Sequence, residues 1–82
     1  MYDVELDPVA EQQRDTLPAD ALAAFMELRA LLEVAPWSGQ PLRPDNPKAN
    51  MLTHTFGGYG VATYVALEER RLVYVVRLVW LG

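Results

Sequence analysis

His54 is the only histidine among the 82 residues, so acid–base chemistry near neutral pH would fall to its side chain. It lies in an alternating run in which Leu52 and Phe56 share its face. That setting favours a packed or half-exposed strand residue, and catalysis by His54 is the alternative interpretation.

Chemistry on a phosphate group would also require cations that hold it, and the residues suited to that task are Arg77, Arg43 and Lys48. The seven basic residues are scattered along the chain, and only Arg70 and Arg71 are adjacent. The sequence therefore predicts no cationic cluster that could stabilise charge developing on phosphorus.

The side chains that usually hold metals or cofactors are scarce. One histidine and no cysteine predict no transition-metal site and no disulfide, and a chain without cysteine is typical of a reducing cytoplasm. The glycine-rich segment 57–60 is not a phosphate-binding loop, because no Lys-Ser or Lys-Thr pair follows it and no helix begins there. We expect no cofactor.

The net charge of −4 and the pI near 4.7 disfavour general binding to RNA or DNA. An acidic surface forfeits the release of counterions that supplies most non-specific affinity for nucleic acids. The composition, 51% hydrophobic and 22% charged, indicates one folded domain over residues 1–82. The start resembles no signal peptide and no apolar run approaches a membrane span, so we expect a cytoplasmic protein.

The first half of the sequence predicts one strand and two helices. Apolar and acidic residues alternate over residues 2–7, as in a strand with one face in water. Asp7 and Pro8 then suit the N-cap and first position of a helix that runs to about Asp15. Leu17-Pro18 gives a similar start signal for a second helix, which continues to Ala35.

The second helix is apolar on two sides. Its predicted core face consists of Ala21, Ala24, Phe25, Leu28, Leu32 and Ala35. A second strip, formed by Ala23, Met26, Ala30 and Val34, lies between two polar edges on the other side. A helix of this kind is usually covered on both sides, and we expect the first helix to cover the strip, with another chain as the alternative.

The second half predicts a loop followed by three strands. Residues 36–50 contain four prolines, which indicates an irregular loop in which Trp37 buries its ring. Strands are predicted over residues 51–56, 61–67 and 72–81, joined by a glycine-rich turn and a charged turn. The order strand, helix, helix, strand, strand, strand predicts an α+β fold, a helical hairpin packed on one face of a mainly antiparallel four-stranded sheet.

The last strand is apolar on both faces. With regular alternation, one face carries Leu72, Tyr74, Val76, Leu78 and Trp80, and the other carries Val73, Val75 and Val79. Such a strand is covered on both sides, within the chain or by a partner. We expect a homo-oligomer or another protein to cover the open face of the sheet. The residues expected at that interface are Trp80, Tyr74, Tyr64 and Val75, together with Met26.

The element order, the Leu17-Pro18 entry into the second helix, the Pro36-Trp37 loop and the final strands resemble the RelE/ParE toxin superfamily. In those strands the similar segments are Phe56-Gly57, residues 61–64 and residues 75–79. The resemblance spans nearly the whole chain and implies the toxin fold and a cognate antitoxin that wraps around it. Members similar to RelE cleave messenger RNA on the ribosome, and members similar to ParE poison gyrase.

The sequence departs from this family where the chemistry would lie. The family has Tyr-Arg-Val after the hairpin glycine, whereas glycine replaces the arginine in Tyr59-Gly60-Val61. The family's last strand continues into a His-Arg pair and a tail, whereas this sequence reads Leu81-Gly82, and Arg77 matches an inner position that varies.

We therefore expect a toxin-like domain without ribonuclease activity that acts through protein–protein contact, with an antitoxin-like protein or a second copy as the partner. An active ribosome-dependent mRNA endoribonuclease that uses His54 as acid and base is the alternative. A domain that binds a small molecule on the open sheet face is a third interpretation.

Overall fold

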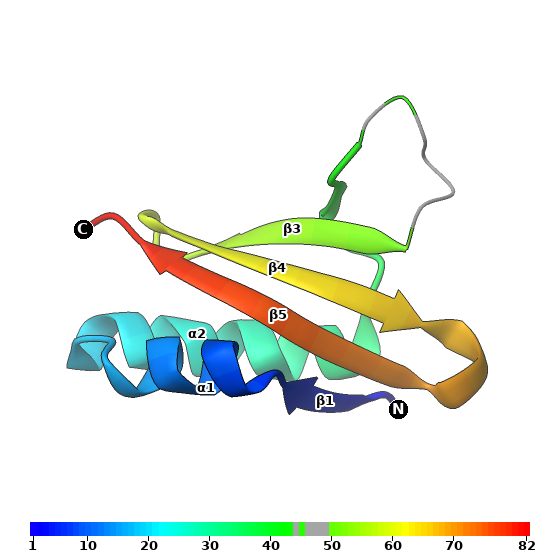
Figure 1. The fold of residues 1–82 in the computed structure, drawn as a ribbon, viewed down its shortest axis with the longest axis horizontal. Coiled ribbons are helices and arrows are strands. Elements are labelled where there is room, and N and C mark those ends of the chain that lie inside the picture. Colours follow the sequence, from blue (N-terminus) through cyan, green and yellow to red (C-terminus); the bar gives the residue numbers. More distant parts are fainter. Residues whose placement is uncertain (44, 46–49) are drawn as a thin grey trace.

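A computed structural model describes residues 1–43, 45 and 50–82, and it contains two helices and one mixed five-stranded sheet (Figure 1). The elements are β1 (Asp3–Leu6), α1 (Pro8–Asp15), α2 (Ala19–Val34), β2 (Gln40–Pro41), β3 (Met51–Phe56), β4 (Gly60–Leu67) and β5 (Leu72–Trp80). A short 3-10 helix, Glu68–Arg70, joins β4 to β5. The predicted α+β fold and the order of its main elements are confirmed.

The sheet has the strand order β1-β5-β4-β3-β2, in which β1 pairs with β5 in parallel and the other pairs are antiparallel. The prediction of four strands is corrected to five, because β2 forms within the proline-rich segment. Gln40 pairs with Thr53, and Leu42 N donates to Met51 O at 2.9 Å. Pro41 is tolerated here because β2 is an edge strand, where a missing N–H costs little.

The first helix begins as its sequence predicts. The Asp7 side chain caps α1, since its Oδ2 accepts a hydrogen bond from Val9 N at 2.9 Å. In α2, Asp20 lies in the first turn, where its charge opposes the positive end of the helix dipole. No helix in the described part of the chain is long and apolar enough to cross a membrane.

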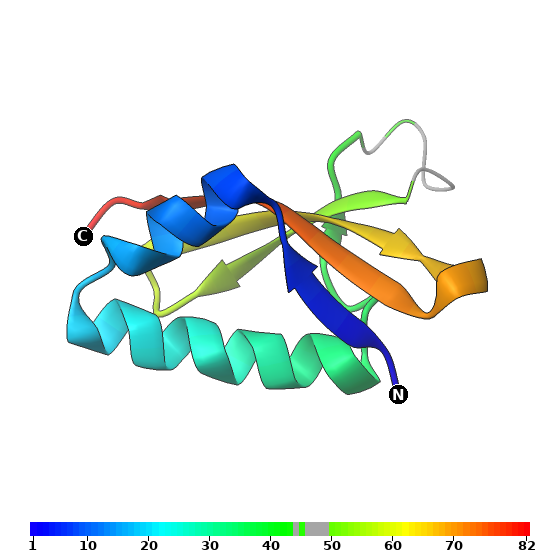
Figure 2. The same cartoon turned by 60° about the horizontal axis from the view of Figure 1, so that its bottom comes forward.

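The two helices occupy different positions relative to the sheet (Figure 2). The buried side of α2, which includes Phe25, Leu28 and Leu32, packs in one core with side chains of β3, β4 and β5. The shorter α1 continues along β5 beyond the end of β1, where Asp7 N donates to Val75 O at 2.8 Å. The Gln13 Oε1 then accepts a hydrogen bond from Leu78 N at 2.6 Å, so a side-chain amide takes the place of a neighbouring strand.

A bulge in β5 changes which residues face the core. Thr63 pairs with Arg77 and Tyr64 pairs with Val75, so Val76 has no partner on β4. The alternation therefore reverses. Val73 and Val75 face α2 before the bulge, and Leu78 does so after it. The prediction that Leu78 and Trp80 share a face with Tyr74 is wrong, because it assumed an unbroken alternation.

Tyr64 joins the loop after α2 to the core. Its side chain is fully buried, and its hydroxyl donates to Pro36 O at 2.8 Å and accepts from Gly39 N at 3.2 Å. Burial raises the pKa of Tyr64, and the hydrogen bond with Gly39 opposes that rise. The predicted burial of the Trp37 ring is wrong, since this residue is 47% exposed and its indole N–H donates to Glu68 Oε2 at 2.9 Å.

The turn between β3 and β4 depends on glycine, as predicted. Gly57 has a φ of 64° and Gly58 has a φ of 82°, and residues other than glycine rarely adopt this backbone conformation. A Cβ at Gly57 would also meet Ala24 Cβ and the Trp80 ring at 3.0 Å. The turn therefore brings the end of the sheet against the first half of α2.

Candidate partner-binding surface

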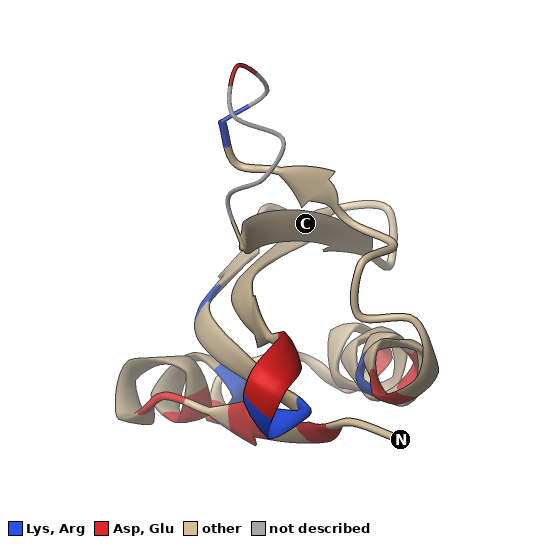
Figure 3. Ribbon diagram, turned by 90° about the vertical axis from the view of Figure 1, so that its right-hand side faces the viewer, with Lys and Arg blue, Asp and Glu red and all other residues tan. Residues whose placement is uncertain are grey.

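The outer side of α2 exposes a continuous apolar surface, which we call the outer strip and define as Leu22, Ala23, Met26, Ala30 and Val34. Met26 is 48% exposed and Val34 is 66% exposed. The prediction that the first helix covers this side is wrong, because α1 lies along β5 and the two helices are well separated (Figure 3). A helix packed on one side and apolar on the other is typical of a surface that another protein covers.

Acidic side chains border the outer strip. Asp20 and Glu27 lie along one edge and are exposed, and Glu33 lies along the other edge. Arg29 is also on that second edge, but its guanidinium donates to Val4 O at 3.2 Å and is partly buried. The cation is thus directed toward β1, and the carboxylates dominate the charge around the strip.

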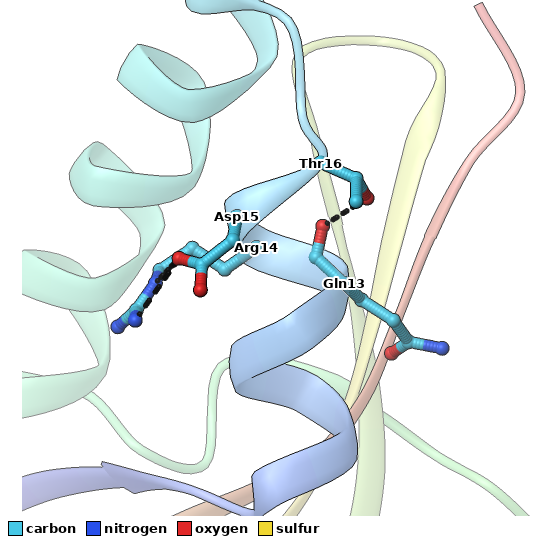
Figure 4. Close-up of polar contacts among 4 residues, drawn as sticks. All are labelled: Gln13, Arg14, Asp15 and Thr16. Atoms are coloured by element: carbon cyan, nitrogen blue, oxygen red, sulfur yellow. Dashed lines mark hydrogen bonds and ion pairs between the residues drawn. The ribbon is translucent and has the colours of Figure 1, made fainter.

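A hollow of about 530 Å³ lies beside Met26, between the two helices and β1. It is lined by Val4, Glu5, Leu6, Glu11, Arg14, Met26 and Arg29. The Arg14 cation is paired with Asp15 at 3.3 Å on the side of α1 that faces α2, while the Gln13 side chain points away toward β5 (Figure 4). Both Glu5 and Glu11 are exposed, so the border of this hollow is acidic as well.

The sheet face opposite α2 carries half-buried side chains in rows that follow the strand register. Val65 and Tyr74 share one row, and Val61 and Val79 share another. The Tyr74 hydroxyl donates to Asp7 Oδ1 at 3.1 Å, which raises the pKa of Tyr74, because the neutral phenol is the form that donates. Tyr74 therefore lies on the predicted face and is held there by the cap of α1.

The other residues expected at a partner interface lie elsewhere. Tyr64 and Val75 are fully buried under α2, so the prediction that placed them on the open sheet face is wrong. Trp80 also packs on the α2 side, where its ring stacks on Phe56 with centroids 5.8 Å apart. Regular alternation gave no sign of the bulge that turns Trp80 inward. Among the described residues of that set, Met26 is the most exposed.

His54 and Arg77 lie on opposite faces of the sheet. His54 pairs with Ala62, which pairs with Leu78, and both of these neighbours are buried against α2. Arg77 pairs with Thr63 in the adjacent row, whose side chains point to the other face, and it is exposed. The acid–base residue of the ribonuclease interpretation and Arg77, one of its three phosphate-binding candidates, are therefore not brought together.

The ring of His54 forms a hydrogen bond with the backbone of the next residue on β3. Its Nδ1 lies 2.8 Å from Thr55 O, and because a carbonyl can only accept, the ring donates through Nδ1–H. The same ring lines a hollow of about 230 Å³ with Ala24, Glu27, Leu28 and Leu31 of α2. Arg43 lies in the segment between β2 and β3 and is exposed. Lys48, the remaining phosphate-binding candidate, lies outside the described residues.

Solved structures of RelE-type proteins share this arrangement. A chain of the toxin–antitoxin complex RelBE2 from Mycobacterium tuberculosis matches with a TM-score of 0.83 and 26% identity, over 98% of this chain and 91% of that chain. A chain of the intact Escherichia coli RelBE toxin–antitoxin complex matches with a TM-score of 0.82 and 10% identity, over 100% of this chain and 99% of that chain.

This chain has the RelE-like toxin fold. An archaeal RelE–RelB complex from Pyrococcus horikoshii is similar over 99% of this chain and 96% of that chain, with a TM-score of 0.67 and 16% identity. No family model matches the sequence, and no curated protein matches it. The predicted resemblance is confirmed at the level of the fold, and the similar complexes contain RelB-type antitoxins.

Proposed function

We propose that this protein is a partner-binding domain with a RelE-like toxin fold, held by an antitoxin-type protein, and that it does not cleave RNA. The observation that carries the proposal is the outer strip, because α2 already buries Phe25, Leu28 and Leu32 on its inner side. Exposed apolar side chains on a second side of the same helix serve no packing purpose within the chain. The similar solved complexes supply the class of partner.

The position of the candidate catalytic groups supports the second half of the proposal. Cleavage of RNA requires an acid–base group and a cation at the same phosphate. His54 and Arg77 project from opposite faces of the sheet, and the sheet lies between them. No single phosphate can contact both side chains while this register persists.

Ribonuclease activity can be tested directly in cells. The wild type and His54→Ala would be expressed separately, and messenger RNA would be mapped by primer extension. We expect the same growth and no new messenger RNA ends for either protein. Growth arrest with new ends from the wild type, both removed by His54→Ala, would establish the ribonuclease alternative instead.

Partner binding can be tested with the product of any small reading frame that is found beside the gene for this chain. The two proteins would be co-expressed, and complex formation would be measured by sedimentation. We expect a stable complex that Met26→Ser weakens. The matched control is Leu42→Ser, because Leu42 is 47% exposed and Met26 is 48% exposed. If the purified chain formed no complex, remained monomeric at high micromolar concentration and bound no hydrophobic dye, the proposal would fail.

A further inference from the structure

We infer that the outer strip of α2 binds an amphipathic helix whose apolar side is flanked by lysine or arginine. The inference rests on the proposed function, since it names the chemistry of the partner.

The shape of the outer strip fits a helix. From Leu22 to Val34 the strip follows α2 for about 18 Å, at 1.5 Å per residue, which matches three turns of a partner helix. Ala23 lies near its start and Ala30 near its middle, and their short side chains allow another helix to approach at about 8 Å between axes. The larger Leu22, Met26 and Val34 then contact the apolar side of that helix.

The charges around the strip indicate which charge the flanking residues of the partner helix should carry. Asp20 and Glu27 on one edge and Glu33 on the other would face the residues that flank its apolar side. Glu5 and Glu11 add negative charge near Met26, while the Arg29 guanidinium bonds to Val4 O and Arg14 pairs with Asp15. Basic flanks complement this border, and acidic flanks would be repelled.

The same charges disfavour a second copy of this chain as the occupant. If two α2 helices packed antiparallel through their outer strips, each edge would face the same edge of the other copy. Glu27, near the middle of the strip, would then oppose its own counterpart across the interface. A parallel pair would place the edge that carries Glu27 opposite the edge that carries Arg29, and the Arg29 guanidinium is turned toward β1. The net charge of −4 on each copy adds to the repulsion.

Two synthetic helical peptides provide the test. Both peptides have the same apolar side, which consists of leucine and alanine. One carries lysine and the other carries glutamate at the positions that flank this side. Binding to the full chain would be followed by fluorescence anisotropy of a labelled peptide. We expect the lysine-flanked peptide to bind at least about tenfold more tightly than the glutamate-flanked peptide at low salt, with the difference shrinking as salt increases.

Variants of the chain locate the binding. Glu27→Lys should weaken the binding of the lysine-flanked peptide several-fold and strengthen the binding of the glutamate-flanked peptide, because it reverses a charge on the edge of the strip. The control is Glu69→Lys, which makes the same charge change at the exposed β4–β5 turn and should have little effect. Met26→Ser should weaken the binding of the lysine-flanked peptide, whereas Leu42→Ser should leave that binding unchanged.

Equal binding of both peptides, no binding of either, or equal losses from Glu27→Lys and Glu69→Lys would overturn the inference. The last result would indicate general attraction to an acidic protein. A co-expressed partner whose complex is weakened by Met26→Ser but not by Glu27→Lys would overturn this inference and leave the proposed function intact. Messenger RNA cleavage that depends on His54 would overturn the proposed function independently of any peptide result.

Discussion

At the scale of single residues, the hydroxyl of the buried Tyr64 side chain links the core to the loop after α2. It bonds to Pro36 O and Gly39 N, and both belong to the segment that leads from α2 to β2. Tyr64→Phe keeps the ring and removes both bonds, so two backbone groups near the core lose their partner. We predict a loss of about 1 to 3 kcal/mol in the free energy of unfolding, measured by urea denaturation.

Tyr59→Phe is the matched control for that substitution, because it removes a hydroxyl from a side chain that is 64% exposed. Its free energy of unfolding should stay within about 0.5 kcal/mol of the wild type. Equal midpoints for Tyr64→Phe and Tyr59→Phe would show that the loop does not depend on the buried hydroxyl.

Tyr74 gives a prediction for alkaline pH. The hydrogen bond to the Asp7 carboxylate raises the pKa of Tyr74 in the folded protein above the value of about 10 that is usual for an unfolded chain. The stabilisation is fully present below pH 10 and is lost as the pH rises through the folded pKa. The stability difference between the wild type and Tyr74→Phe should therefore shrink above pH 10 in urea denaturation, and a constant difference would contradict this account.

At the scale of elements, one side-chain amide contributes a hydrogen bond to the contact between α1 and β5. Gln13 Oε1 accepts a hydrogen bond from Leu78 N just beyond the bulge, where β5 has α1 beside it and no longer β1. Gln13→Ala removes this acceptor, and we predict a loss of about 1 to 2 kcal/mol in the free energy of unfolding. The Leu78 amide should also exchange its hydrogen faster.

Gln12→Ala provides the control at the neighbouring position, because Gln12 is exposed and the substitution keeps the same helix propensity change. We expect it to leave both the midpoint of unfolding and the exchange of Leu78 close to the wild type. Equal effects of the two substitutions would mean that the helix, and not the hydrogen bond, is what they perturb.

Most of the elements could be predicted from local signals. The Asp7 cap and the following proline gave α1 from Pro8 to Asp15, and the alternating run gave β3 from Met51 to Phe56. The bulge at Val76 could not be predicted, because in an uninterrupted apolar strand either face satisfies the same pattern. This explains why Trp80 was assigned to the wrong surface. Val75 precedes the bulge and Tyr64 lies on β4, and for these two residues the sequence did not show which face of the sheet α2 covers.

The candidate site was predictable in part. Helical periodicity identified Met26 and its neighbours as a second apolar side of α2. It could not tell whether α1 would cover that side, because the position of α1 depends on contacts with Val75 and Leu78, distant in sequence. His54 and Arg77 were predicted as candidates from residue type alone, and their relative position depends on strand register, which the sequence does not show.

At the scale of the whole molecule, charge is distributed unevenly. Charged residues lie mainly on the helices, β1 and the β4–β5 turn, and the central strands are nearly free of them (Figure 3). Arg77 is the one charged residue within β3, β4 and β5, all three of which are described throughout. The chain therefore offers little positive surface to a phosphate backbone.

We predict that a labelled single-stranded RNA binds this protein only weakly at physiological salt, because few phosphate contacts can release counterions. The measurement is a titration followed by anisotropy at two salt concentrations, with a basic RNA-binding domain of similar size as the positive control. Tight binding that weakens steeply with added salt would contradict the charge argument.

The parallel pairing of β1 with β5 has a consequence for how the protein folds. The bond from Tyr74 to Asp7 joins residues 67 positions apart, and the bond from Leu78 to Gln13 joins residues 65 positions apart. The β3–β4–β5 meander can form from neighbouring segments, whereas β1 has no strand to pair with until β5 exists. Such distant contacts are slow to form because a long loop must close first. During synthesis, β1 and α1 therefore leave the ribosome first and are fixed in place last.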